Sequence, residues 1–139
     1  MKRMQGKIAE HNSANFTGSV KLENIEIDIL GFKNLRCLKV SFEEGARTYW
    51  HKHPSGQILV ILSGEGRIGN KNENNETIVQ KLNPGDIFVT DPGEMHWHGA
   101  SSNKKMIHVA IQADIEWSNN QVTESEYTKT GNRNKKINP

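Results

Sequence analysis

Short runs of apolar and β-branched residues recur along the middle of the chain, and a turn signal closes each run. The clearest runs are residues 57–62, 77–82, 87–90 and 106–112. The segments 83–86 and 91–94 between them contain Pro, Gly, Asn and Asp, which favour tight turns. Many short strands at regular spacing, without a long helical period, predict an all-β sandwich or barrel.

In residues 35–42 and 106–112, side chains at every second position share a face, and this alternation identifies an interior face. In residues 35–42 the apolar side chains of Leu38, Val40 and Phe42 share one face, and Cys37 lies on the other. In residues 106–112 one face carries Met106, His108, Ala110 and Gln112. We therefore expect the interior of the barrel, including any substrate pocket, to be lined by Leu38, Val40, Phe42, Met106 and Gln112.

The two ends of the chain differ from the middle in composition. Residues 1–15 are polar, and we expect a flexible N-terminal arm. Residues 128–139 are rich in Asn, Gly and Lys, and we expect a disordered basic tail. Between them we expect one domain, residues 16–127, which ends in a short helix begun by a capping box of Thr123 and Glu126.

Charge and cysteine content narrow the possible partners and compartment. The net charge is +2, and four positive charges of the tail contribute to it, so the remaining chain has a charge of 2 − 4 = −2. The basic pI is thus a property of the tail, and we expect no nucleic-acid surface. A single cysteine, Cys37, and the absence of a long apolar segment predict a cytoplasmic protein without membrane contact.

Five of the six histidines fall between positions 51 and 108. His51 and His53 are two apart on an extended segment, so both rings project from one face. Gln57 follows closely, His96 follows a Pro-Gly turn, and a barrel can bring all four side chains to one interior point. Ordinary hydrogen-bonded histidines are the alternative. Because divalent metals bind several nitrogen or oxygen donors on rigid elements, the pattern favours a metal site on His51, His53, Gln57 and His96.

Two further histidines and two tryptophans lie near these positions. His108 lies on an interior face, where it is either a hydrogen-bonded core residue or a general acid or base, since histidine transfers protons near neutral pH. His98 shares a face with His96, and its role stays open between the surroundings of the pocket and the surface. Trp50 and Trp97 alternate with predicted ligands and should pack on the opposite face.

The glycines around the first histidine pair resemble the first motif of the cupin family. Gly45 precedes His51 by six positions, and Gly64 follows Gln57 by seven. In the family motif a Glu stands where this chain has Gln57. A glutamine leaves the full charge of a divalent ion uncompensated and departs from the two-histidine, one-carboxylate pattern of iron oxygenases.

The second cupin motif is also matched in spacing. Gly85, Gly93 and His96 occupy its positions, whereas Asp91 replaces a Pro and Ala100 replaces an Asn. This resemblance implies a single-domain cupin β-barrel, also called a double-stranded β-helix or jelly roll. It further implies one divalent metal ion per chain, with Mn, Fe, Ni, Co and Zn all compatible with the donors.

A narrower resemblance rests on the segments GARTYWHKHPSGQILVILSGEGR and NPGDIFVTDPGEMHWHGASSNKKMIHVAIQ. They are similar to the small bacterial cupins that include manganese-dependent hydroxynitrile lyases, and to cupins found beside carboxymuconolactone decarboxylase domains. The resemblance implies manganese on the four predicted ligands, a base-like role for His108 and a pocket position for Gln112. It also places Leu38 and Val40 in the substrate cavity, where the bulk of Leu38 would narrow the pocket.

These inferences lead to three classes of function. The first is a metal-dependent lyase that cleaves or forms cyanohydrins or similar small hydroxylated carbonyl compounds, or acts on a keto or lactone acid. The second is an Fe(II) cupin dioxygenase, and the third is a non-catalytic barrel that binds a small molecule. Fold alone does not decide among them. By analogy with other cupins, we expect a homodimer or a larger homo-oligomer.

Overall fold

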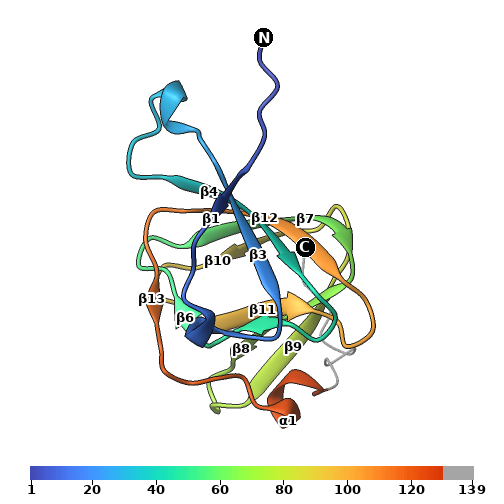
Figure 1. The fold of residues 1–139 in the computed structure, drawn as a ribbon. Helices are drawn as coiled ribbons and strands as arrows, with labels where there is room; N and C mark the ends of the chain where they lie inside the picture. The colour runs from blue at the N-terminus through green and yellow to red at the C-terminus, as the bar shows by residue number, and fades with distance from the viewer. Residues whose placement is uncertain (130–139) are drawn as a thin grey trace.

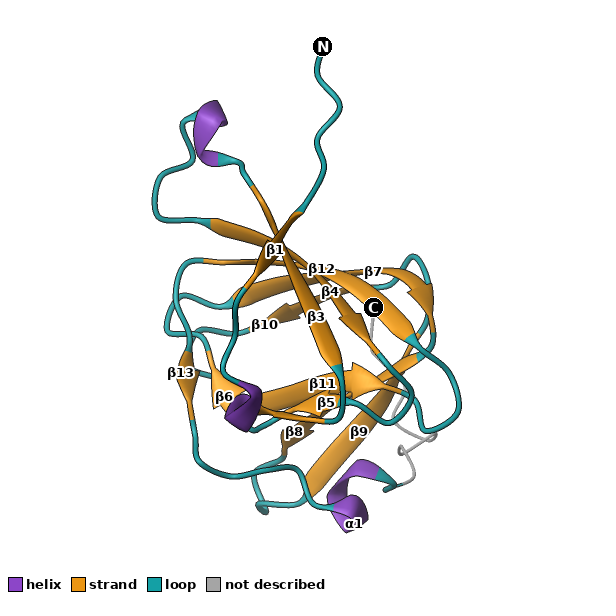
Figure 2. Ribbon diagram, viewed as in Figure 1, coloured by secondary structure: helices purple, strands orange, loops and turns teal. Residues whose placement is uncertain are grey.

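The computed structural model describes residues 1–129 and consists almost entirely of antiparallel β-structure (Figures 1 and 2). Two sheets face each other to form the barrel. One has six strands, in the order β1 (Lys7–Ala9), β3 (Val20–Ile25), β4 (Arg36–Phe42), β12 (Met106–Gln112), β7 (Gln57–Gly64) and β10 (Ile87–Thr90). Most of the tail expected at residues 128–139 lies outside the described residues.

The second sheet has seven short strands. They are β2 (Phe16–Thr17), β5 (Arg47–Thr48), β6 (His51–Lys52), β8 (Gly66–Lys71), β9 (Thr77–Leu82), β11 (His96–Ala100) and β13 (Glu116–Trp117). On one side β11 pairs with β5 and β6, and on the other with β8, which also pairs with β9. The described helices are short: η1 (Ser13–Asn15), η2 (Asp28–Leu30) and α1 (Glu124–Tyr127).

The main core fills the space between the two sheets. Its centre is fully buried, with Leu59, Leu82 and Met106 each 0% exposed. The expected interior face is confirmed, because Leu38, Val40 and Phe42 are all buried in this cluster. Burying such side chains stabilises the fold by about 1.5–3 kcal/mol each.

A second apolar cluster lies on the outer side of the seven-stranded sheet, where α1 covers it (Figure 1). It contains Trp50 and Trp97, which pack away from the interior as expected. The Trp97 indole lies so close to β8 that a Cβ on Gly69 would approach its ring to 2.3 Å. The predicted capping box is present: Thr123 Oγ1 accepts from the Glu126 N–H, and the Glu126 carboxylate accepts from the Thr123 N–H.

Most predicted strands are confirmed, and β9, β10 and β12 begin and end where the sequence pattern places them. The expected N-terminal arm is different in part, since Lys7–Ala9 form β1 and pair with Leu22–Asn24 of β3. The outer edge of β3 offers unpaired backbone groups, which even a polar segment can satisfy. Within residues 1–129, no helix has the length and apolar character required to cross a membrane.

Candidate metal centre

Strand pairing brings the four predicted ligands to one end of the barrel interior. His51 begins β6 and His96 begins β11, and the two residues are direct cross-strand partners. Gln57 begins β7 in the opposite sheet. His53 directly follows the end of β6, in the loop that leads to β7. The structure therefore brings together the residues that the sequence pattern singled out.

Two tight turns hold the backbone around His53. Its carbonyl oxygen accepts hydrogen bonds from the N–H groups of Gly56 and Gly93, one from each motif, at 2.9 Å. Gly56 has a positive φ of 83°, and a Cβ there would come within 2.8 Å of the Thr90 carbonyl oxygen. Glycine is required at this position because of both the left-handed backbone and the close approach of β10.

The three predicted histidine ligands share one hydrogen-bonding pattern. Nδ1 of each ring lies 2.7–2.9 Å from a backbone carbonyl oxygen, that of Tyr49 for His51, Asp114 for His53 and Glu94 for His96. A carbonyl only accepts, so each Nδ1 carries the proton and each neutral ring presents the lone pair of Nε2. Carbonyl contacts of this kind fix the tautomer and orientation of metal-binding histidines. The ring centroids lie 4.4–5.4 Å apart.

Gln57 supplies an oxygen beside these nitrogens. Its side-chain Nε2 donates to Gln112 Oε1 at 2.6 Å, and its Oε1 lies 3.1 Å from His96 Nε2. Because His96 donates its only proton through Nδ1, two electron-pair acceptors face each other across this distance. A cation bound to both atoms resolves that conflict.

Burial keeps the histidines of this cluster neutral. It lowers the pKa of His96 to about 4 and that of His108 to about 3. Burial also depresses the pKa of His51, His53 and His98, and for His51 and His98 neighbouring histidines depress it further. At neutral pH these rings therefore present lone pairs, which is the form that binds a metal ion.

His98 and His108 form a buried pair next to the predicted ligands. His108 Nε2 lies 3.1 Å from His98 Nδ1, so the two rings share one proton across this contact. By distance alone, His51, His96 and His98 form the tightest group, with one nitrogen of each within 4.8 Å of the others. His53 and His98 each have a buried Nε2 without a hydrogen-bond partner among the described residues. They differ at Nδ1, which contacts the Asp114 carbonyl in His53 and the His108 ring in His98.

The donor set fits a divalent metal ion. His53 Nε2 is buried and has no hydrogen-bond partner among the described residues, although its ring is held firmly by Asp114. An orphaned acceptor of this kind costs free energy unless another group satisfies it. Three imidazole nitrogens and one amide oxygen are donors that suit Mn, Fe, Co, Ni or Zn. The cluster can therefore hold a metal ion, and its chemistry leaves the identity of the ion open.

The residues expected to line a substrate pocket are all buried. Four of them belong to the main core: Leu38, Val40, Phe42 and Met106. Gln112 is also buried and contacts Gln57. Their role in a substrate pocket stays a prediction.

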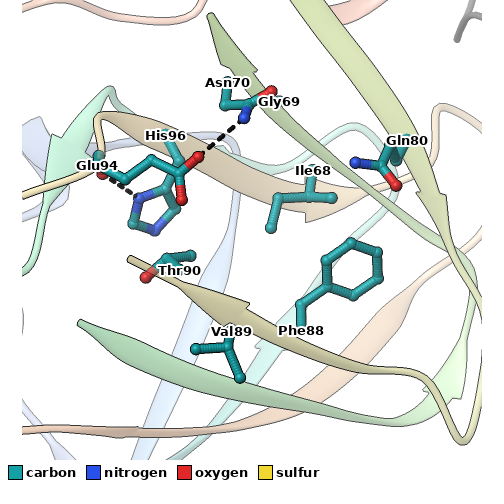
Figure 3. Close-up of a pocket in the computed structure, with 9 residues that line it drawn as sticks. All are labelled: Ile68, Gly69, Asn70, Gln80, Phe88, Val89, Thr90, Glu94 and His96. Carbon is teal, nitrogen blue, oxygen red and sulfur yellow. Dashed lines mark hydrogen bonds between the residues drawn. The ribbon is translucent and has the colours of Figure 1, made fainter. Parts of the chain in front are cut away.

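A separate pocket of about 100 Å³ opens beside His96, between β8 and β10 (Figure 3). At its polar end, Asn70 Nδ2 donates to a Glu94 carboxylate oxygen at 2.9 Å, and the Glu94 backbone carbonyl meets His96 Nδ1. Phe88 and Ile68 line the rest. This volume has room for a few water molecules close to the predicted centre.

Sequence reasoning left His98 undecided and did not find the pairing of Gln57 with Gln112. The position of His98 could have been inferred from the face that it shares with His96. The contact between Gln57 and Gln112 could not, because it depends on the register that places them opposite each other on adjacent strands.

The family described as "Cupin domain" matches residues 38–111. An (R)-mandelonitrile lyase from Granulicella tundricola is 39% identical over 95 residues, which cover 65% of this chain and 69% of the lyase. Relatives of this chain therefore include an enzyme.

Solved structures show the same fold. The crystal structure of a cupin-like protein from Thermotoga maritima has a TM-score of 0.78 and 32% identity, covering 95% of this chain and 99% of the other. A polyketide cyclase from Streptomyces resistomycificus has a TM-score of 0.69 at 13% identity, covering 91% and 90%. Together with the two motifs and the barrel, these findings show that the chain belongs to the cupin family.

Proposed function

We propose that this protein is a divalent-metal-dependent lyase that cleaves or forms small cyanohydrins, with manganese as its metal. The observation that supports this most is the set of three neutral imidazoles whose Nδ1 atoms are all held by backbone carbonyls. That arrangement presents their Nε2 atoms, together with Gln57 Oε1, as ligands. The likeness to an (R)-mandelonitrile lyase supports the choice of substrate class.

The ligand set is electrically neutral. When bound, the metal would supply Lewis acidity and a positive charge that stabilises an anion. Because no ligand is a carboxylate, the whole charge of a divalent ion stays available to a substrate that binds through oxygen or cyanide. This supports a lyase over an Fe(II) dioxygenase, whose usual triad includes a carboxylate.

His108 is the group we assign to proton transfer. Its Nδ1 is buried without a hydrogen-bond partner among the described residues, whereas its Nε2 contacts His98. The ring is neutral at neutral pH, so a nitrogen lone pair is available to accept the hydroxyl proton of a cyanohydrin. In the reverse direction the same ring returns the proton. The carbon–carbon bond to cyanide breaks as the hydroxyl oxygen becomes the carbonyl oxygen.

The first experiment is purification without chelator, followed by metal counting by mass spectrometry and an assay of mandelonitrile cleavage. A double variant, His51→Ala with His96→Ala, is the matched control. We expect about one manganese per chain, loss of metal and activity in the double variant, and loss of activity with retained metal in His108→Ala. Unchanged activity of His108→Ala would remove His108 from the mechanism.

Other results would redirect the proposal. Iron with oxygen uptake would indicate the dioxygenase, and tight ligand binding without turnover would indicate a binding protein. Failure to bind any divalent metal after reconstitution would refute the metal site itself.

The outer face of the six-stranded sheet supports self-association, which we include in the proposal. Ile58 and Leu62 of β7 are 40% and 48% exposed, and Ile87 and Val89 of β10 are each 66% exposed. Antiparallel sheets usually have a polar outer face, and this one is apolar. These four side chains lie on paired strands and form one apolar patch that a standard interface of ~800 Å² per partner could include. A second copy of the chain, which brings the same uncharged face, fits this surface.

A further inference from the structure

Gln112 is the buried partner of Gln57. The two residues are direct neighbours on the paired strands β12 and β7, and they are 6% and 5% exposed. Gln57 Nε2 donates to Gln112 Oε1 at 2.6 Å. Because an amide has its oxygen and its NH₂ group on opposite sides, this bond directs Gln57 Oε1 toward His96 Nε2.

The orientation of Gln57 conflicts with its other neighbour. His96 donates its proton to the Glu94 carbonyl, so its Nε2 presents a lone pair to Gln57 Oε1 at 3.1 Å. A rotation of the Gln57 amide by 180° would replace this contact with a hydrogen bond from the amide NH₂ group to His96. That rotation would also turn the NH₂ group toward the metal position and remove the oxygen ligand. The rotation would also break the hydrogen bond to Gln112 Oε1, and restoring a bond there would require the Gln112 amide to rotate as well.

We propose that Gln112 is a positioning residue that holds the Gln57 amide with its oxygen toward the metal. This role rests on the metal site proposed above and differs from that of a residue that contacts substrate. Two further observations support it. Both glutamines lie on the central strands of the six-stranded sheet, where the backbone is fixed on both sides. Their bond is also buried, where water does not compete for it.

The test compares manganese affinity in variants of Gln112, measured by competition with a chelating dye. Gln112→Leu removes the acceptor with little change in volume, and we expect affinity to fall 10–100-fold, as for other residues that orient metal ligands. Gln112→Glu keeps an oxygen acceptor and should retain affinity or increase it. Ile61→Val, a buried change in the main core on β7, is the control for packing and should bind like the unmodified protein.

A second measurement follows the Gln57 amide without manganese. Its NH₂ signals in a ¹H–¹⁵N spectrum of the metal-free protein are assigned by their loss in Gln57→Glu. We expect these signals to shift in Gln112→Leu and to stay near their positions in Ile61→Val. If Gln112→Leu does not fold, Gln112→Met is the alternative, because it also lacks a strong acceptor.

The outcomes separate this inference from the proposed function. If the unmodified protein binds manganese and Gln112→Leu binds it equally well, Gln112 has no positioning role and the metal site stands. Equal loss of affinity in Gln112→Leu and Gln112→Glu also overturns the inference, since only one of them lacks the acceptor. If the unmodified protein binds no metal, the proposed function and this inference fail together.

Discussion

Acidification should destabilise the metal-free protein strongly, because its folded state excludes protons from a cluster of histidines. Burial lowers the pKa of His96 to about 4 and that of His108 to about 3. In the unfolded chain a histidine has a pKa of about 6.5. The unfolded state therefore binds more protons below pH 6.5, and stability is fully present above that pH and declines as pH falls toward 4.

The size of the effect follows from these values. At pH 5 an unfolded histidine is almost completely protonated, whereas both buried rings are still neutral. Each of the two histidines then reduces the free energy of unfolding by about 2 kcal/mol relative to pH 7.5. His51, His53 and His98 act in the same direction. Since domains of this size are stable by only about 5–15 kcal/mol, a loss of about 4 kcal/mol is a large fraction.

The fall in the free energy of unfolding can be measured by urea unfolding at pH 7.5, 6 and 5. Chelator is present, and tryptophan fluorescence reports the transition. His108→Leu is the matched variant, because it removes one buried titrating ring and should reduce the slope by roughly 1 kcal/mol per pH unit. Manganese should raise stability at pH 7.5 more than at pH 5, since protons compete for the same nitrogens. Stability that is constant or rises between pH 7.5 and 5 would refute the reasoning.

Three further predictions concern the ligands, the packing and the assembly. Metal counting should show that His53→Ala loses the ion and His98→Ala keeps it. The reverse result would favour His51, His96 and His98 as the ligands. Gly69→Ala should lower the free energy of unfolding by about 1–3 kcal/mol, because its Cβ would meet the Trp97 ring at 2.3 Å, and an unchanged thermal midpoint would contradict this. Light scattering should detect a dimer that Val89→Asp converts to a monomer, and an unaffected dimer would place the interface elsewhere.

The sequence pattern located the interior of the barrel well, because burial in a sheet has a period of two residues. Leu38 and Val40 could be assigned to the interior from alternation alone, and both are buried. The same rule placed His51 and His96 on interior faces. Turn residues then limited each strand, which explains the correct bounds of β9, β10 and β12.

Features that depend on register or long-range packing could not be predicted. Alternation assigns His98 to a face but gives no distance, so its contact with His108 required the structure. β1 is short and polar, and it forms only because the edge of β3 is available. The amide pair of Gln57 and Gln112 depends on a bulge in the pairing of β7 and β12, between Ile107 and His108, which shifts the register.

Residues near the end of the described chain hold the outer side of the seven-stranded sheet. The Arg47 guanidinium donates to the Val122 carbonyl and the Glu124 carboxylate, and it lies 4.2 Å from the centre of the Tyr127 ring. Tyr127 in turn donates its hydroxyl hydrogen to the Ala100 carbonyl.

These contacts have a consequence for biosynthesis. On the ribosome, β4 can pair with β3 soon after both are synthesised. Its other edge stays unpaired until β12 has been synthesised. The second apolar cluster cannot form before Val122 and Tyr127 are present. Pairings between distant segments slow folding and leave apolar edges uncovered in the meantime. We therefore expect nascent chains that stop before Tyr127 to remain sensitive to protease, and chains released only a few residues later to become resistant.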